Sequence, residues 1–189
     1  MYMGAGMHGK SGQSPKVVLK IWNSVVIPIL TYGLDILNLS DKHLDQLESF
    51  QYRSIRQILS LHDNTPNVAI LSLTGLLPIT ALVHKRMLGT FMRICSSTES
   101  VEWEIINRQL AIKDNSQPSI VNRVKSVLTK YQLPSIFQLF ANPINKNQWK
   151  HTCDVHVDNY WIASITNTAK LYPSLRHLNT NKYCPNKPH

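Results

Sequence analysis

The sequence has few charged residues, and acidic residues are the scarcest of them. Charged residues make up 16% of the 189 residues, with 11 Asp and Glu against 20 Lys and Arg. No two aspartates are adjacent, whereas two-metal phosphoryl transfer needs clustered carboxylates. The formal net charge of +9 favours a polyanionic partner and carries no information about sequence preference. We therefore predict a protein without catalytic residues, cofactor or small-molecule substrate.

Cysteine is also scarce, and its placement does not predict a metal site. Cys95, Cys153 and Cys184 are an odd number without the spacing of a disulfide framework, which indicates reduced thiols in an intracellular protein. A structural zinc site needs four ligands at compatible spacing. The half-pairs Cys153–His156 and Cys184–His189 lie too far apart to favour one, so we expect no metal. Spacing leaves a Cys/His catalytic pair open, but no pattern supports it.

The sequence has no apolar run long enough for a membrane helix, which needs about 20 residues. Its most apolar stretch, Val25–Leu39, contains Asp35, and the N-terminus lacks the apolar core of a signal peptide. We expect no membrane segment.

Gly4–Ser11 matches the phosphate-loop pattern G-x-x-x-x-G-K-[ST]. Only three residues precede Gly4, however, so no buried strand can lead into the loop, and we expect a flexible connector over residues 1–14.

Helix signals occur along most of the chain, and no alternating strand pattern does. Ser14-Pro15 predicts a helix start, and Pro28 predicts a kink. Gly33 predicts a break or a close backbone approach. The apolar face expected for this helix consists of Val17, Val18, Ile21, Trp22, Val25 and Ile29.

Three further helices are expected before residue 98. Ser40 predicts the start of one, Thr65-Pro66 the start of a short one that stops near Gly75, and Pro78 the start of another. The first of these places Glu48, Tyr52 and Arg56 on the face opposite its apolar positions. The last has an expected polar stripe of Arg86, Gly89, Thr90, Arg93 and Ser97.

Downstream, helices are predicted over 100–112, over 118–131 and around Trp149, Trp161 and Ile165. The tail Asn179–His189 is predicted to be disordered. The predicted fold is all-α, an irregular helical bundle over 15–97 with a helical C-terminal extension over 98–178. The four tryptophans are expected to pack in the core.

Basic side chains are the candidates for binding, because they neutralise phosphates. The candidate nucleic-acid-binding residues are Arg53, Arg56, Lys85, Arg86, Arg93, Arg123 and Lys130. Arg86 and Arg93 are seven residues apart, so they lie nearly aligned on one helix. Arg123 and Lys130 have the same spacing.

A collinear series of short motifs resembles one protein family. Val26, Pro28 and Leu30 are followed by Tyr32, Gly33 and Asp35. The segment LDQLESFQYRSIRQILSL supplies Leu47, Gln51, Arg56, Ile58, Leu59 and Leu61. Thr65-Pro66, Ala69, the run Gly75–Ile79 and Lys85-Arg86 complete the series. The series resembles the region after the polymerase core, the thumb and post-thumb, in the reverse transcriptases of non-LTR retrotransposons. Two later segments, VEWEIINRQLAIKD and NYWIASITNTAKLYPSLRHLN, are similar to post-thumb segments of invertebrate-type elements.

The resemblance implies a parent that copies RNA into DNA, whose palm and catalytic carboxylates would precede Met1. The chain is then a non-catalytic fragment with a thumb-like helical bundle. Its expected partner is the backbone of RNA or DNA, bound weakly and without sequence specificity, in the nucleus or the cytoplasm. Two alternatives remain: a helical protein-interaction module with no nucleic-acid role, and a small basic protein of the membrane surface.

Overall fold

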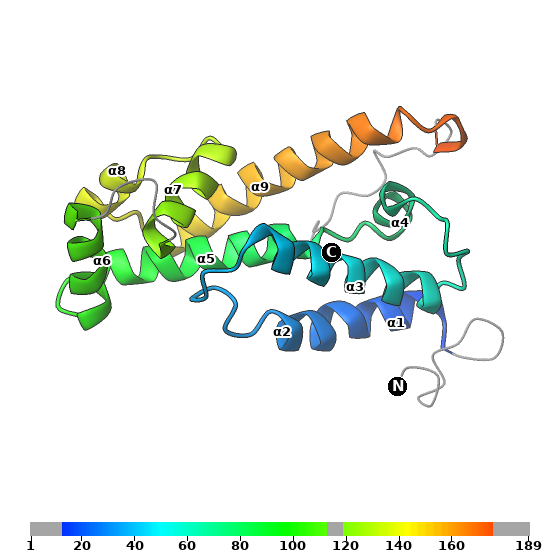
Figure 1. The fold of residues 1–189 in the computed structure, drawn as a ribbon, viewed down its shortest axis with the longest axis horizontal. Helices are drawn as coiled ribbons and strands as arrows, with labels where there is room; N and C mark the ends of the chain where they lie inside the picture. The colour runs from blue at the N-terminus through cyan, green and yellow to red at the C-terminus, as the bar shows by residue number, and fades with distance from the viewer. Residues whose placement is uncertain (1–12, 113–118, 176–189) are drawn as a thin grey trace. The chain divides into compact units, whose positions relative to one another are not determined.

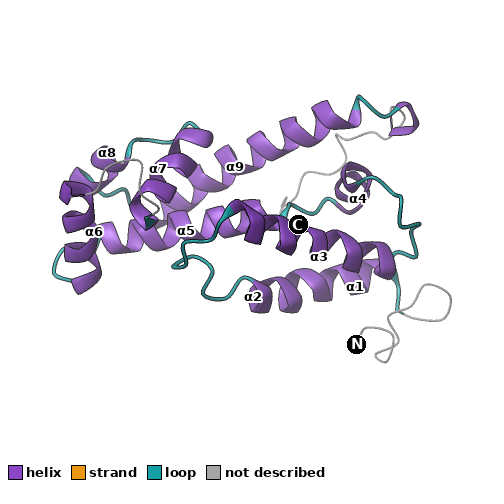
Figure 2. Cartoon of the chain, viewed as in Figure 1, coloured by secondary structure: helices purple, strands orange, loops and turns teal. Residues whose placement is uncertain are grey.

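The computed structural model describes residues 13–112 and 119–175, and every regular element in these ranges is helical (Figure 2). The all-α prediction is therefore confirmed. In chain order the elements are α1 Pro15–Ile21, the π-helical turn η2 Trp22–Val26, α2 Ile27–Leu30, α3 Asp41–Ile58, α4 Asn67–Thr74, α5 Ile79–Cys95, α6 Val101–Ile112, α7 Ile120–Lys130, α8 Ile136–Ala141, α9 Lys146–Ala169 and the short 3₁₀ turn η3 Pro173–Leu175 (Figure 1).

The chain forms two compact units that interleave in sequence. Unit 1 consists of Met1–Tyr32, Asp41–Thr80 and Trp161–His189, and unit 2 of Gly33–Ser40 and Ala81–Tyr160. Helices α5 and α9 therefore each contribute residues to both units. The domain boundaries expected from the sequence, after residues 14, 97 and 178, stay a prediction.

The first helical segment of unit 1 runs without a gap from Pro15 to Leu30. Pro15 occupies the first helical position, as predicted, although Ser14 makes no side-chain cap bond. Pro28 has no N–H to donate, and the single π turn just before it absorbs this irregularity, with the N–H of Ile27 donating to the carbonyl of Trp22. The segment ends before Gly33, which has a φ of +71° and no atom within 4 Å of an added Cβ. Gly33 therefore marks a break, not a close approach.

The apolar face expected for this segment needs correction. Val18 and Trp22 are buried, and the ring of Trp22 stacks on that of Phe50 at 6.2 Å. Helix α3 covers Trp22 through Phe50, so the core position expected for this tryptophan is confirmed. Val25 and Ile29 are instead 48% and 72% exposed, because the π turn rotates the residues after it relative to those before it.

Helix α3 holds the rest of unit 1 through buried polar side chains. Gln51 is 1% exposed, donates from Nε2 to the carbonyl of Leu77 at 3.0 Å, and accepts from the N–H of Ile79 at 3.0 Å. The side chain of Glu48 accepts a hydrogen bond from Thr80. The face predicted to be opposite the apolar positions is therefore partly internal, and Tyr52 on it is buried as well.

Helix α4 starts one residue later than predicted and stops where predicted. Pro66 stands at the N-cap with a ψ of 141°, so the first helical residue is Asn67 and Thr65 provides no side-chain cap. Gly75 ends the helix in the left-handed conformation, with a φ of 66°, which glycine adopts without a Cβ penalty.

Unit 2 is built around the buried face of α5. Val83, Met87 and Phe91 are at most 3% exposed. On α9 the indole Nε1 of Trp149 donates to the carbonyl of Leu88 at 2.9 Å. On α7 the residues Val121, Val124 and Leu128 are buried, and so is Tyr131 at its C-cap. Trp103 and Trp161 are only half-buried, so core packing holds fully for Trp22 and Trp149.

The sequence analysis missed one short helix in unit 2. Helix α8 begins with a capping box, in which the hydroxyl of Ser135 accepts from the N–H of Gln138 and the Gln138 side chain accepts from the N–H of Ser135. The S-x-x-Q pattern that produces this cap lies between Pro134 and Pro143.

No single described helix is long and apolar enough to cross a membrane. Helices α4 and α5 satisfy the length and composition requirement only together, as a pair bent by 65° at the break between them. A core helix satisfies the same requirement, and Ile70 of α4 and Ile79 of α5 are both 0% exposed.

Candidate nucleic-acid interface

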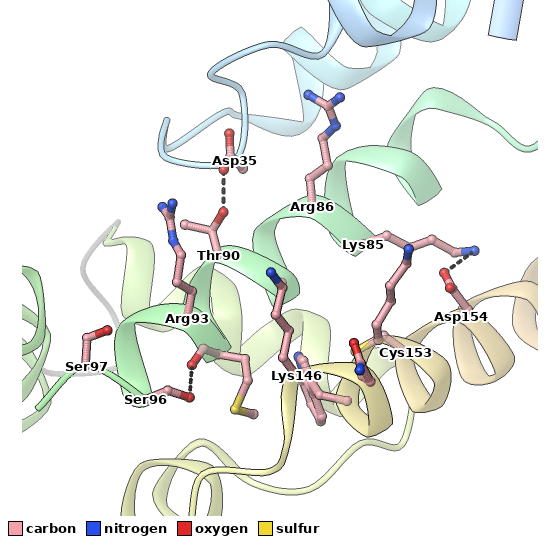
Figure 3. A pocket seen from close by; sticks show the side chains of 15 residues that line it. Asp35, Lys85, Arg86, Thr90, Arg93, Ser96, Ser97, Lys146, Cys153 and Asp154 are labelled. Atoms are coloured by element: carbon pink, nitrogen blue, oxygen red, sulfur yellow. Dashed lines mark hydrogen bonds and ion pairs between the residues drawn. The ribbon is translucent and has the colours of Figure 1, made fainter. Parts of the chain in front are cut away.

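Five basic side chains line one pocket in unit 2. A pocket of about 840 Å³ is lined by one side of α5, by the first turns of α9 and by Asp35. Figure 3 shows Arg93 and Thr90 on α5, and Lys146 on α9, around this pocket. Its cationic lining residues are Lys85, Arg86, Arg93, Lys146 and Lys150, and its anionic ones are Asp35 and Asp154.

Helical spacing explains why α5 presents basic residues here. Arg86, Gly89 and Arg93 are exposed, whereas Met87 and Phe91 are buried on the opposite side. Steps of three and four residues keep the first three on one face of the helix. The predicted polar stripe of α5 is therefore observed, and it forms one wall of the pocket.

The two carboxylates of the pocket are already engaged. Asp154 accepts from the ammonium of Lys85 at 2.9 Å. Asp35 accepts from the hydroxyl of Thr90 at 2.5 Å. Neither carboxylate pairs with Arg93, Lys146 or Lys150, and these three cations make no hydrogen bond or ion pair to any residue that the structure describes. The pocket therefore carries a local excess of positive charge.

Lys85 has a structural role that the sequence did not predict. Its ammonium lies 2.9 Å from Asp154 and 2.7 Å from Asp158, and its side chain is 17% exposed. Burial raises the pKa of Asp158, and the hydrogen bond from Lys85 opposes that shift. A lysine held between two carboxylates is poorly placed to neutralise a phosphate, so the prediction for Lys85 is revised.

Arg56 is likewise committed within its own unit. Its Nε and a terminal nitrogen donate to the carbonyl of Thr65 at 3.1 and 2.7 Å, and that nitrogen also donates to Asn67 at 2.6 Å. These bonds fix the loop before α4, so we no longer assign Arg56 to the interface. Arg53 is exposed on α3 in unit 1, whereas the residues that line the pocket belong to unit 2.

Arg123 and Lys130 lie near the aromatic cluster of unit 2 instead of lining the pocket. The Nζ of Lys130 lies 5.7 Å from the ring centroid of Tyr131 and 5.2 Å from that of Tyr160. Both cations lower the pKa of the buried His84, whose Nδ1 is 2.8 Å from the Tyr131 hydroxyl. Of the seven predicted residues, the pocket thus gathers Lys85, Arg86 and Arg93.

Sequence reasoning missed Lys146 and Lys150. They are four residues apart at the start of α9 and therefore lie on one face. This spacing was visible in the segment KNQWK, but nothing local shows that α9 packs beside α5. Comparison of the chain with known protein families, curated proteins and solved structures finds no match. The resemblance to reverse transcriptases therefore stays a prediction.

The cysteine and histidine residues in the described part do not form a metal-binding group. Burial raises the pKa of the Cys153 thiol to about 12, and the Nδ1 of His156 lies 3.0 Å from the carbonyl oxygen of Tyr131. Within residues 13–112 and 119–175, no three His, Cys, Asp or Glu side chains are grouped for metal binding. The phosphate-loop pattern Gly4–Ser11 and the pair Cys184–His189 lie outside the described residues.

Proposed function

We propose that the chain binds the backbone of RNA or DNA weakly and without sequence specificity, through the pocket between α5 and α9. Its origin is proposed to be the thumb and post-thumb region of a retrotransposon-type reverse transcriptase, without the catalytic palm. The net charge of +9 and the ordered resemblance of the motifs from Val26 to Arg86 support this reading.

The observation that carries the proposal is the group of Arg93, Lys146 and Lys150 around one pocket. These three cations form no ion pair with a carboxylate among the described residues, and the cations that line the pocket outnumber its carboxylates. Three cations that each neutralise one phosphate give a slope of log affinity against log salt of about −2.1 on a single strand, or about −2.7 on duplex. Such a slope corresponds to weak, salt-sensitive binding.

A salt titration with a charge-matched control tests the proposal. Fluorescence anisotropy of a labelled oligonucleotide measures affinity at several salt concentrations for the wild type and for the double variant Arg93→Ala/Lys146→Ala. The double variant leaves one unpaired cation at the pocket, so the slope should flatten by about 1.4 on a single strand. The loss should be equal for unrelated base sequences, because phosphate contacts carry no sequence information.

The matched control removes the same charge from unit 1. Lys20 on α1 and Lys42 on α3 are exposed, so Lys20→Ala/Lys42→Ala lowers the net charge equally without changing a residue that lines the pocket. We expect it to leave the slope within about 0.5 of the wild type. Equal effects of the two double variants would mean that net charge alone, and not the pocket, drives binding.

A second function has its own supporting observation, an exposed apolar face on the first helical segment of unit 1. Val25, Ile29 and Tyr32 follow one another at helical spacing and are 48%, 72% and 83% exposed. Exposed apolar side chains at one face indicate a contact surface, which suits a helical protein-interaction module. A folded chain that binds no nucleic acid at low salt would favour this alternative.

A further inference from the structure

The shape of the pocket narrows the class of nucleic acid, an inference that rests on the proposed function. We propose that the pocket between α5 and α9 takes a single strand and excludes duplex. The cations lie on two sides of a hollow instead of along a flat or convex ridge. Arg93 belongs to α5 and Lys146 to α9 (Figure 3), and Lys150 also belongs to α9. A strand inside the hollow is neutralised from both sides, whereas a duplex resting on its edge meets fewer of these charges.

The size of the pocket also favours a single strand over a duplex. Its volume of about 840 Å³ falls within the range of about 300–1,000 Å³ that encloses small ligands. A hollow of that size accommodates a short stretch of one strand. A duplex does not fit inside it, because its two strands are held apart across grooves of about 12 Å and about 6 Å and both would have to enter.

Gly89 keeps the α5 wall open. It lies one turn from both Arg86 and Arg93 on the exposed face, and a Cβ built there meets no atom within 4 Å. A large side chain at position 89 can therefore extend into the hollow without displacing neighbouring atoms. This property provides a blocking variant that removes no charge.

The pocket does not supply base stacking, which explains why the binding is expected to be weak. Trp149 is the aromatic residue among the described lining residues, but it is 1% exposed and its Nε1 is bonded to Leu88. Stacking on an accessible aromatic contributes about 1–3 kcal/mol per base in proteins that bind single strands. Here the contacts are to phosphates, so the bases remain unread.

The test compares one oligonucleotide in two forms, single-stranded and annealed to its complement, at equal low salt. The proteins are the wild type, the blocking variant Gly89→Trp and its control Gly89→Ala. We expect the wild type to favour the single strand, although duplex has the higher charge density. Gly89→Trp should weaken single-strand binding by about tenfold or more, because a strand kept out of the hollow loses its contacts with the three cations. Gly89→Ala should bind as the wild type does.

The outcomes separate this inference from the proposed function. Equal affinity for both forms, or a folded Gly89→Trp variant that binds the single strand as tightly as the wild type, overturns the inference and leaves backbone binding in place. No binding of either form by the folded wild type overturns both. Circular dichroism checks that Gly89→Trp folds. If it does not, Lys150→Glu on the opposite wall replaces it, with the same loss expected for the single strand.

Discussion

Replacing Gln51 by leucine removes the polar side chain that fixes the start of α5 in unit 1. Gln51 is 1% exposed, and its amide bonds both the carbonyl of Leu77 and the N–H of Ile79 at 3.0 Å. Leucine cannot replace either bond, so both backbone groups lose their partner. A buried polar group without a partner costs about 1–3 kcal/mol. The N–H of Ile79 is buried but the bond to Leu77 is only partly so, so we expect a loss of about 2–4 kcal/mol for Gln51→Leu, below the roughly 2–6 kcal/mol of two fully buried groups.

This loss is a large part of a typical stability of about 5–15 kcal/mol. For a chain of this size about 1 kcal/mol shifts Tm by about 2–4 °C, so we expect a fall in Tm of roughly 5–15 °C. Thermal and urea unfolding followed by circular dichroism measure both quantities. Gln57→Leu is the control, because Gln57 is exposed on the same helix and should change stability by no more than about 0.5 kcal/mol.

The variant Gln51→Glu tests the same role of Gln51 through the pH dependence of its stability. Its ionised carboxylate still accepts from Ile79 but repels the carbonyl of Leu77, whereas the protonated carboxyl can donate to it. Folding therefore raises the pKa of the introduced carboxyl above its unfolded value of about 4.3. Its stabilising contribution is present below that unfolded pKa and is lost as the pH rises. Gln51→Leu and Gln57→Leu variants of equal stability would refute this role of Gln51.

Two further predictions concern pH and catalysis. The pKa of His84 is lowered from 6.5 to about 3, by burial first and then by the charges of Lys130 and Arg123. As the pH falls below 6.5, His84 therefore takes up a proton in the unfolded chain before it does so in the folded one. The wild type should lose about 2 kcal/mol of its free energy of unfolding by pH 5, and a non-titrating His84→Gln variant should not. Parallel pH profiles of the two proteins in urea unfolding would contradict this. Primer extension with template, nucleotides and magnesium should stay at background, because the sequence has no Asp-Asp pair. Extension that a chelator abolishes would overturn the prediction that the chain has no catalytic residues.

Several roles could not be obtained from the sequence because they depend on contacts between distant segments. Arg56 was a candidate phosphate ligand until the loop at Thr65 was seen to occupy its donors. Lys85 was a candidate until two carboxylates of α9 were seen beside it. Both are solvated cations in a helical projection of their own helix. Only the packing of a second segment turned them into structural residues.

Which residues of α1 and α2 are buried could not be predicted fully from the sequence either. The pattern from Val17 to Ile29 assumed an unbroken period of 3.6 residues. The π turn before Pro28 shifts that period, so Trp22 faces α3 while Val25 and Ile29 face solvent. A single extra residue in one helical turn is enough to exchange inside and outside.

The sequence by itself determined that the described chain is helical and where several helices begin and end. Pro15, Gly75 and the stripe from Arg86 to Arg93 act through backbone angles and helical period, which are properties of a few adjacent residues. The tertiary structure alone decided which charges gather. Arg93 on α5 and Lys146 on α9 line one pocket because the buried Trp149 fastens α9 to Leu88, a contact between residues far apart in the chain.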